Sequence, residues 1–573
     1  MMNTYNLLKR KQKKFVLLSF LLSMLSGVLL GCGWPTNGNP LYLFVSFVPL
    51  LYLENFLEGS FLSVFVFSYF SFLTWNGIAT WWLYYSQHSN GSFALEAYCI
   101  PIFFNAFFMS IVFSFSSWIK KYSECRKIGY AFFIFFWIVL EKIHLEWELS
   151  WPWLNLGNGF ANRIEWIQWY EYTGTLGGTL WIWIVNIILS VAIIEYDENR
   201  NIIVFYKKIF TSLMIIFSLI LISSILYMKY GTQQSNKYIE VLVLQPNIDP
   251  YHQKYQTSTE QCVYDFQNLM DQNISKKSMI IVAPETAFPG YGYKIPTKDL
   301  EGDRLIHFFR EYLRKKSPKT VFLTGLELFE IYDRKDKSDT STKFFFGLNE
   351  SEKWIDLFNS IVQIASESPM NNYHHKSKLV PAVETFPYKK IFYPILGNIL
   401  LDFGGEVMEL GKANNISVFQ HPYCKVKIAP IICYESVFGE YVSKFFKKNA
   451  ELMVIITNDG WWGNTQGHKQ HCYYSRLRAI ENRKWIARSA NTGISCFINE
   501  RGDIISYVPY GKKGVIREQV ALNKKKTFYI QHGDYIAKIS LLFVINIFSY
   551  VVVNNIFKFF EKILRYNQRY LKI

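Results

Sequence analysis

The sequence predicts two kinds of architecture in one chain: a polytopic α-helical membrane region and an α/β layered domain. Hydrophobic residues make up 50% of the 573 residues and aromatic residues 18%, proportions typical of membrane proteins. Residues 15–230 are almost continuously apolar, residues 231–534 have the composition of an ordinary α/β protein, and residues 538–557 are apolar again. We therefore predict seven membrane spans within 1–230, an extracytoplasmic domain at 231–534, and a last span with a basic tail at 535–573.

About eight apolar stretches are candidate transmembrane helices, most of them close to the ~20 residues that a bilayer requires. They are residues 15–31, 40–53, 60–84, 98–119, 128–145, 177–194, 209–229 and 538–557. The second stretch is short for a complete span. The segment SWPWLNLG at 150–157 lies between two of these stretches, and we expect it to run along the membrane surface.

The formal charge of +16 invites a nucleic-acid interpretation, but the cations lie mostly at the ends of the predicted spans. If the N-terminus is cytoplasmic, the basic loops all fall on the cytoplasmic side, whereas the outer loops 32–39 and 86–96 contain no Lys or Arg. The inner cations are Lys9, Arg10, Lys11, Lys13, Lys14, Lys120, Lys121, Arg126, Lys127, Arg200, Lys207, Lys208, Lys558, Lys562, Arg565, Arg569 and Lys572. We expect a multi-pass membrane protein with both termini cytoplasmic and no nucleic-acid partner.

The first span also has features of a lipoprotein signal peptide, because basic residues precede it and Leu30-Gly31-Cys32 follows it. Leu30 is a poor residue for such a cleavage site, and the next span begins directly after the loop at 32–39. We therefore expect an uncleaved membrane span.

Cysteine spacing gives no indication of a metal site, because the chain has no CxxC pair. Five of the eight cysteines lie in the outer domain, so an oxidising compartment leaves at least one thiol unpaired within the chain. These five are Cys262, Cys424, Cys433, Cys472 and Cys496.

From residue 238 onward, short apolar strands alternate with stretches that can form helices, which predicts an α/β layer architecture. We predict strands at 239–245, 279–283, 320–326, 358–365, 425–432, 451–457, 494–498 and 504–508, and helices at 256–275, 301–315, 437–447 and 469–486. The charged stretch 331–356 is predicted to be a linker of low order.

Three polar groups follow predicted strands, where chemistry collects in α/β sheets: Glu285 after MIIVAP, the lysines of HHKSKLVP, and Cys433 after KVKIAPII. A thiol reacts as its thiolate, so it needs a base such as a glutamate to take its proton. An ammonium group can stabilise the oxyanion that forms when the thiolate attacks a carbonyl. Each residue alone also has a structural explanation: a core cysteine, a helix-capping glutamate, or a solvated loop lysine.

With their surroundings, these residues resemble the nitrilase (carbon–nitrogen hydrolase) superfamily, whose catalytic set is Glu, Lys and Cys in that order. The similarity is greatest to its integral membrane branch, the apolipoprotein N-acyltransferases. It rests on GWP at 33–35, SWPWLNLG at 150–157, LQPNI at 244–248, PETAFP at 284–289, KxxLVPxxE at 376–384, ICYESVFGE at 432–440, TNDGWWG at 457–463, QH with RLRAIENR at 470–483, and ANTGIS at 490–495. The resemblance implies that 231–534 is a catalytic αββα sandwich.

The resemblance implies that Glu285 is the general base, Lys376 the oxyanion-stabilising cation and Cys433 the nucleophile. It also implies that Glu384 and Glu435 are supporting acids. The chain departs from the family pattern around the lysine, where His374 replaces a tyrosine and Val383 a glycine. Lys378 is therefore a rival for Lys376, although spacing to Leu379-Val380-Pro381 favours Lys376.

Five further residues are expected near the site: Tyr434, Asn458, Asp459, Trp461 and Trp462. Asn458 and Asp459 also fit a simple turn after a strand. The two tryptophans fit either interfacial anchors or a mobile aromatic lid.

The resemblance implies ping-pong transfer of an acyl chain from a phospholipid to the N-terminal amine of a diacylglyceryl-cysteine apolipoprotein through a Cys433 thioester. This is the last step of lipoprotein maturation, and it takes place at the bacterial inner membrane, with the catalytic domain periplasmic. We expect a monomer without cofactor or metal. The alternatives are a membrane-tethered amidase acting on a small amide, a transporter with an outer ligand-binding domain, and a non-catalytic docking module for lipoproteins. A transporter predicts ionisable residues in mid-span, of which the sequence has few.

Overall fold

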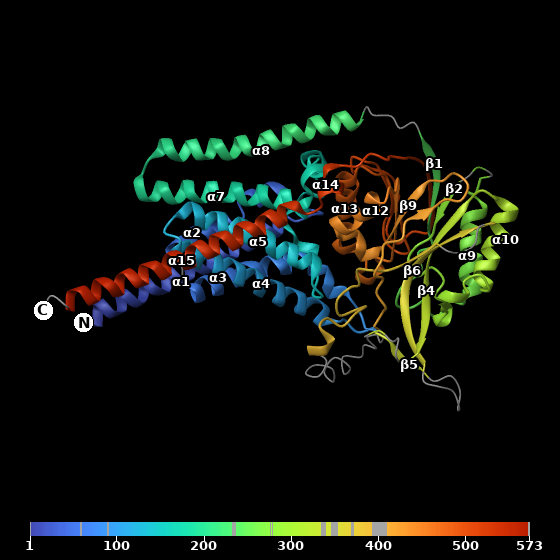
Figure 1. Cartoon of the computed structure of the whole chain (residues 1–573), viewed down its shortest axis with the longest axis horizontal. Helices are drawn as coiled ribbons and strands as arrows, with labels where there is room; N and C mark the ends of the chain where they lie inside the picture. Colours follow the sequence, from blue (N-terminus) through green and yellow to red (C-terminus); the bar gives the residue numbers. More distant parts are fainter. Residues whose placement is uncertain are drawn as a thin grey trace.

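In the computed structural model, a bundle of long helices joins an α/β domain, and α1 begins and α15 ends at the far end of the bundle (Figure 1). The structure describes residues 2–57, 60–88, 91–231, 237–275, 277, 279–333, 338, 340–344, 353–367, 372–391 and 409–570.

Within these residues, seven helices are long and apolar enough to cross a membrane. They are α1 (Met2–Cys32), α3 (Phe61–Ala79), α4 (Leu95–Tyr122), α5 (Arg126–Glu146), α7 (Thr175–Asn199), α8 (Ile202–Gly231) and α15 (Tyr535–Tyr570). Each contains one of the predicted spans or most of it. Helices suit a bilayer because they satisfy all their backbone hydrogen bonds internally. Helices α8 and α15 are largely unburied by protein, as expected of lipid-facing helices.

The short candidate span at 40–53 is not one continuous helix in the structure. The chain forms a 3-10 helix at Pro40–Phe44 and then the short helix α2 (Val48–Phe56), with a proline in the first turn of each. Proline lacks an N–H and suits the start of a helix, so it favours two short helices here. Tyr52 of α2 donates a 2.7 Å hydrogen bond to Asp197 near the end of α7.

The loops predicted to be cytoplasmic meet at the end of the bundle away from the α/β domain. Arg126 pairs with Glu198 at 2.6 Å, and Lys208 pairs with Glu195 at 2.6 Å. Two further pairs at this end are Lys120 with Glu54 and Lys558 with Glu124. The basic loops are therefore on one side, as the positive-inside pattern requires.

The α/β domain contains two facing sheets. The first has the order β14 (Gly514–Ala521), β1 (Tyr238–Gln245), β2 (Met279–Val282), β4 (Val321–Asp333), β6 (Lys353–Ala365), β5 (Thr342–Phe344), with β3 (Ile295–Pro296) beside β4 and β7 (Tyr373–His375) beside β6. The second has the order β13 (Ile504–Val508), β12 (Ser495–Ile498), β11 (Ile486–Ala490), β10 (Leu452–Thr457), β9 (Lys427–Ile432), β8 (Phe419–Gln420). Strands β1, β2 and β4 are parallel, as are β9, β10 and β11.

Alternate side chains of each central strand enter different cores, which produces the predicted αββα sandwich. In β1, Val241 and Val243 face the second sheet, while Leu242 and Leu244 face helices α9 (Thr259–Asp271) and α10 (Arg304–Lys316). In β10, Val454 faces the first sheet. Its neighbours on the strand point toward α12 (Gly439–Lys447) and α13 (Gln466–Asn482), whose core continues into the membrane helices.

Several predicted boundaries change in the structure. The helix predicted at 469–486 ends at Asn482, because Arg483 adopts a left-handed conformation (φ 50°) that terminates it, and the missed strand β11 follows. The missed strand β14 pairs with β1 at the edge of its sheet and is half-exposed. Part of the predicted linker 331–356 is strand, because β4 continues to Asp333 and β6 begins at Lys353; residues 334–337, 339 and 345–352 lie outside the described residues.

The segment SWPWLNLG is largely buried between the bundle and α13. That it runs along the membrane surface stays a prediction. Gly157 is pressed against α7, where an added Cβ would lie 1.9 Å from the Thr175 carbonyl oxygen. Gln470 of α13 is fully buried and forms hydrogen bonds with this segment and with neighbouring parts of the bundle. Its Oε1 accepts hydrogen bonds from Trp82 and Trp153 at 3.1 and 2.7 Å, and its Nε2 donates to the carbonyls of Pro35 and Ala79 at 2.8 and 3.1 Å.

Replacing Gln470 with leucine is expected to destabilise the junction between the α/β domain and the bundle. The change leaves two indole N–H groups and two carbonyls buried without a partner, each costing about 1–3 kcal/mol. The apparent thermal midpoint of the detergent-solubilised protein should fall by several degrees. Gln531→Leu, at an exposed position of helix α14 (Phe528–His532), is the control. Equal midpoints for the two variants would contradict the role assigned to Gln470.

Candidate active site

The residues predicted from strand ends meet at one edge of the two sheets. β2 leads to Glu285, β9 leads directly to Cys433, and β10 leads to Asn458. These strands belong to the parallel parts of the facing sheets, so their carboxyl ends lie together. Lys376 follows β7, and its backbone N–H donates a 2.8 Å hydrogen bond to the carbonyl of Asn359 in β6.

Cys433 lies on a sharp turn between β9 and the 3-10 helix that it begins (Cys433–Val437). Its φ of 49° is left-handed, a conformation that costs a non-glycine residue free energy and often marks functional sites. The turn is held from both sides: Glu435 accepts a 2.9 Å hydrogen bond from the N–H of Ile432, and Ser436 donates a 2.7 Å hydrogen bond to the carbonyl of Cys433. The side chain is partly exposed.

Glu285 is 6% exposed and its carboxylate has a fixed orientation. Its Oε1 accepts hydrogen bonds from Asn359 Nδ2 at 2.6 Å and Lys376 Nζ at 3.2 Å, and its Oε2 accepts one from the backbone N–H of Asn458 at 3.0 Å. The carboxylate is therefore held by both sheets.

Lys376 is 1% exposed and lies between two carboxylates. Its Nζ is 2.7 Å from Glu384 Oε1 and 3.2 Å from Glu285 Oε1. Burial disfavours the ammonium form, but the charges of Glu285 and Glu384 outweigh burial and hold the pKa of Lys376 well above its ordinary value. The side chain is a permanent cation.

Lys378 points elsewhere. Its Nζ donates a 3.2 Å hydrogen bond to the carbonyl of Leu145, near the end of α5, and lies 4.8 Å from the centre of the Phe438 ring. Burial and the nearby cations Lys412 and Lys444 lower its pKa to about 8. The structure therefore brings Lys376, and not Lys378, to Glu285.

The two predicted supporting acids hold different parts of the site. Glu384 binds Lys376 with one oxygen and accepts a 2.8 Å hydrogen bond from the N–H of Val380 with the other. Glu435, fully buried, accepts a 2.6 Å hydrogen bond from the N–H of Ser377 as well as the bond from Ile432, so it links the lysine loop to the cysteine turn.

The environment of Glu435 keeps it ionised. Burial alone would raise the pKa of Glu435, but His374, the N–H of Ser377 and the hydroxyl of Tyr441 bring it below its ordinary value. His374, the residue that departs from the family pattern, lies 3.5 Å from Glu435. The departure thus supplies a partner for this acid.

The other expected neighbours differ in their surroundings. Tyr434 donates a 2.9 Å hydrogen bond to the carbonyl of Ser150, which connects the cysteine turn to the bundle. The Trp461 ring packs against Tyr251, with centroids 5.3 Å apart. The Trp462 ring packs against Trp82 of the membrane region at 4.6 Å.

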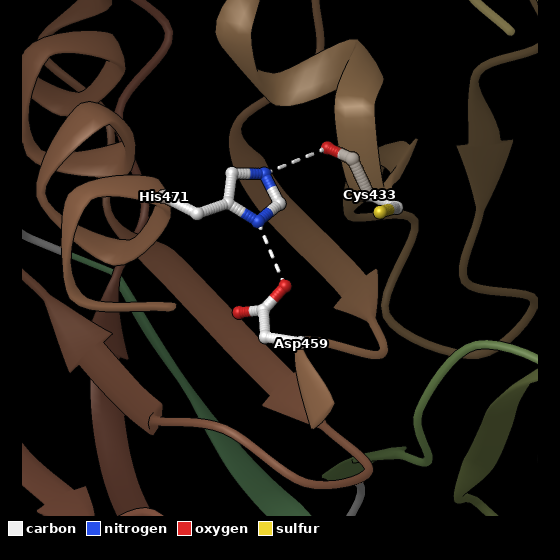
Figure 2. A group of neighbouring side chains, drawn as sticks. All are labelled: Cys433, Asp459 and His471. Atoms are coloured by element: carbon white, nitrogen blue, oxygen red, sulfur yellow. Dashed lines mark hydrogen bonds and ion pairs between the residues drawn. The ribbon is translucent and has the colours of Figure 1, made fainter. Parts of the chain in front are cut away.

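Asp459 and His471 lie beside Cys433 but not on its sulfur (Figure 2). His471 Nδ1 is 2.8 Å from Asp459 Oδ1, and its Nε2 is 3.3 Å from the Cys433 carbonyl oxygen. The sulfur lies within 4.8 Å of ligand atoms of both residues, but no hydrogen bond joins it to either of them among the described residues, and the bond from His471 goes to the Cys433 carbonyl (Figure 2). His471 therefore fixes the backbone of the nucleophile turn and is not placed to take the thiol proton.

Cys433, Asp459 and His471 have ligand atoms within 4.8 Å of one another, as a metal site would require. Both ring nitrogens of His471 already have partners, because Nε2 also lies 3.0 Å from the Ser436 hydroxyl. Asp459 accepts a 2.6 Å hydrogen bond from Arg488, whose charge, with that of His471, outweighs burial and lowers the pKa of the carboxyl. A cation would have to displace Arg488, so this arrangement fits a structural ion pair better than a metal site.

The surroundings of Cys433 favour the thiol over the thiolate. Burial and the negative charges of Glu285 and Asp459 raise its pKa far above the ordinary value, while Lys376 and a hydrogen bond with Thr457 oppose the rise. Because Glu285 and Lys376 both act on the sulfur, a proton can pass to the carboxylate as a new bond forms. The arrangement suits nucleophilic attack assisted by a base.

Sequence reasoning missed three residues of the site: Asn359, His471 and Lys254. Asn359 is one polar residue within a long strand, and nothing in its spacing points to Glu285. His471 belongs to the QH motif at 470–471, and the motif alone does not indicate a contact with the turn of Cys433. Lys254 is 3% exposed in the loop between β1 and α9, and its burial depends on the tertiary structure.

Comparisons with known proteins agree with this architecture. A model of the carbon–nitrogen hydrolase family matches residues 241–527, and a model of the apolipoprotein N-acyltransferase N-terminal domain matches residues 26–188. The apolipoprotein N-acyltransferase of Chlorobaculum tepidum is 27% identical over 532 residues, covering 91% of this chain and 94% of the relative.

Two further relatives cover almost the whole chain. Apolipoprotein N-acyltransferase 1 of Treponema denticola is 24% identical over 581 residues, covering 95% of this chain and 98% of the relative. The apolipoprotein N-acyltransferase of Thermotoga maritima is 25% identical over 544 residues, covering 93% and 94%. The chain belongs to the carbon–nitrogen hydrolase family, or nitrilase superfamily, and it also carries the N-terminal domain of the apolipoprotein N-acyltransferases.

Proposed function

We propose that this chain is a phospholipid:apolipoprotein N-acyltransferase that works through a Glu285–Lys376–Cys433 catalytic set. One observation carries the proposal: a buried Glu285–Lys376–Glu384 charge cluster lies beside a partly exposed thiol, where the α/β domain joins a bundle of membrane-spanning helices. The activity named for the relatives supports it.

In the first half-reaction, the Cys433 sulfur attacks the ester carbonyl carbon of a phospholipid. Glu285 takes the thiol proton, and the carbonyl electron pair moves onto oxygen, where the Lys376 ammonium stabilises it. Collapse of the tetrahedral intermediate breaks the ester carbon–oxygen bond. Glu285 returns the proton to the leaving oxygen, so a lysophospholipid departs and a thioester remains on Cys433.

In the second half-reaction, the free α-amine of a diacylglyceryl-cysteine apolipoprotein attacks the thioester. Glu285 takes a proton from the amine, and the sulfur leaves as the amide forms. The same carboxylate can then reprotonate Cys433, which restores the resting thiol. A ping-pong sequence follows, because the phospholipid product leaves before the acceptor reacts.

Water must be kept from the thioester between the two steps. The aromatic rings of Trp82, Trp153 and Trp462 pack together at the junction with the bundle, which supports an apolar route for both lipid substrates. In this arrangement, residues 231–534 form the periplasmic catalytic domain of a monomer in the bacterial inner membrane. The two short helices within Pro40–Phe56 together make the second of seven spans in residues 1–230. Residues 535–573 contribute the eighth span, α15, and a cytoplasmic tail.

Cys433→Ala is expected to abolish the acyl-enzyme. Intact-mass measurement after incubation with a palmitoyl phospholipid should give a palmitoyl-sized adduct on the unaltered protein and none on the variant. Cys424→Ala, at an exposed thiol, should keep the adduct. An adduct that survives Cys433→Ala would disprove the nucleophile assignment. Ammonia release from small amides without phospholipid would instead indicate the amidase alternative.

Lys376→Ala and Lys378→Ala are expected to differ sharply. Loss of Lys376 removes the cation between Glu285 and Glu384 and should lower the rate of lipopeptide acylation by at least about 10²-fold. Lys378→Ala removes a contact to the bundle and should leave most of the rate. The measurement is acylation of a defined lipopeptide, with thermal midpoints as folding controls. A larger loss for Lys378→Ala would reverse the assignment.

A further inference from the structure

A second lysine is buried near the proposed catalytic residues. Lys254 is 3% exposed and lies where the loop after β1 turns back toward α9. Asp249 builds this turn: its carbonyl accepts hydrogen bonds from the N–H groups of Gln253 and Lys254 at 3.2 and 2.9 Å, and its side chain accepts one from Tyr251 N–H at 2.8 Å. The loop is anchored as well, because the Tyr251 hydroxyl donates a 2.9 Å hydrogen bond to the Trp461 carbonyl.

The Lys254 ammonium has no hydrogen-bond acceptor among the residues that the structure describes. Two aromatic rings lie beside it, Tyr255 at 5.7 Å and Trp461 at 5.8 Å from Nζ to ring centroid. A buried ammonium held only by ring faces is unfavourable, because it has lost water and gained no acceptor. Burial accordingly lowers the pKa of Lys254, although Glu285, Glu327 and Cys433 oppose the shift.

The two carboxylates that act on Lys254 already have other partners. Glu285 is bonded to Asn359, Lys376 and Asn458. Glu327 accepts a 3.2 Å hydrogen bond from the Tyr255 hydroxyl and lies 3.9 Å from Lys294. Both carboxylates therefore have hydrogen-bond or ion-pair partners without Lys254. The N–H donors of Lys254 are available to bind an oxygen atom of a substrate.

The charges of the site favour the same conclusion. Glu285 and Glu384 carry two negative charges against the single positive charge of Lys376. The Trp461 ring, 5.8 Å from Lys254 Nζ, comes three residues after Asn458, whose backbone N–H donates a hydrogen bond to Glu285 Oε2. Lys254 therefore lies at the same end of the sheets as Glu285, where its positive charge opposes the excess negative charge. Trp461, beside Lys254, also lines a cleft of about 340 Å³ with Tyr251 and Tyr510, so one neighbour of Lys254 borders a cleft.

We propose that Lys254 is a second catalytic cation, whose ammonium donates a hydrogen bond to the oxyanion formed when Cys433 attacks the acyl carbonyl. The inference rests on the proposed acyl transfer. As the sulfur–carbon bond forms, the carbonyl π electrons move to oxygen, and Lys254 and Lys376 share that negative charge. Glu285 holds the thiol proton until the ester carbon–oxygen bond breaks. The oxyanion also forms in the second half-reaction, so Lys254 acts in both.

The test is Lys254→Met in the full-length protein, which keeps the length of the side chain and removes its charge. Lys294→Met is the matched control, because Lys294 is also beside Glu327 but is 28% exposed. With a phospholipid and a defined lipopeptide, we expect Lys254→Met to lower kcat by about 10²-fold, as loss of one oxyanion donor does, with KM changed less than about twofold. Lys294→Met should keep both constants near those of the unaltered protein.

Alkylation of Cys433 by iodoacetamide gives a second readout, which needs no substrate. Removing the Lys254 charge should slow alkylation at fixed pH, because the nearby cation favours the thiolate. Unchanged kcat, or a rise in KM alone, would overturn the proposal; a rise in KM alone would indicate binding of the lipid phosphate. If the unaltered protein acylates no lipopeptide but Lys254→Met still slows alkylation, the proposed function fails while Lys254 remains a cation of the Cys433 site.

Discussion

The site depends on one buried ammonium shared by two carboxylates. Lys376 lies 3.2 Å from Glu285 and 2.7 Å from Glu384, and all three side chains have lost most of their contact with water. Such a cluster is stable only if its remaining lone pairs are hydrogen-bonded. Backbone N–H groups of Asn458 and Val380 meet this need, so the charges fix the loops after β7 and β10 in relation to β2.

A separate set of hydrogen bonds holds the turn that carries Cys433. Glu435 accepts hydrogen bonds from backbone groups on both the cysteine turn and the lysine loop, and His471 contacts the carbonyl of Cys433. The strained φ of Cys433 is thus held by bonds to its backbone neighbours, while no hydrogen bond joins its sulfur to Asp459 or His471 among the described residues. The groups that hold the turn, Glu435 and His471, are thus different from Glu285 and Lys376, which act electrostatically on the thiol.

Much of this arrangement could be predicted from sequence, because its signals are local. Apolar runs followed by a polar residue mark Glu285, Cys433 and Asn458, and their strands are parallel, so their ends meet. Lys376 could be preferred to Lys378 only by spacing, and the structure separates them because one side chain turns inward and the other toward α5.

The features that sequence reasoning missed depend on long-range contacts. The amide of Asn359 gains its role from a carboxylate on another strand, and Lys254 resembles any loop lysine until the fold buries it. The division of residues 40–56 into two short helices has a local cause, the proline in the first turn of each. A prediction based on apolar composition alone does not take these prolines into account. Strand β14 is at the edge of its sheet and is mostly half-exposed, so its apolar and polar residues alternate only weakly.

The apolar core beneath α12 and α13 continues into the membrane helices, so the α/β domain and the bundle are not independent folding units. Tyr441, Phe445 and Leu477 belong to the same apolar cluster as Trp137 and Trp183 of the bundle. The helical layer formed by α12 and α13 is therefore covered by the membrane helices and not by solvent. The α/β domain without the membrane helices would expose a large apolar surface on this layer. We therefore expect the separate domain to aggregate unless this layer rearranges.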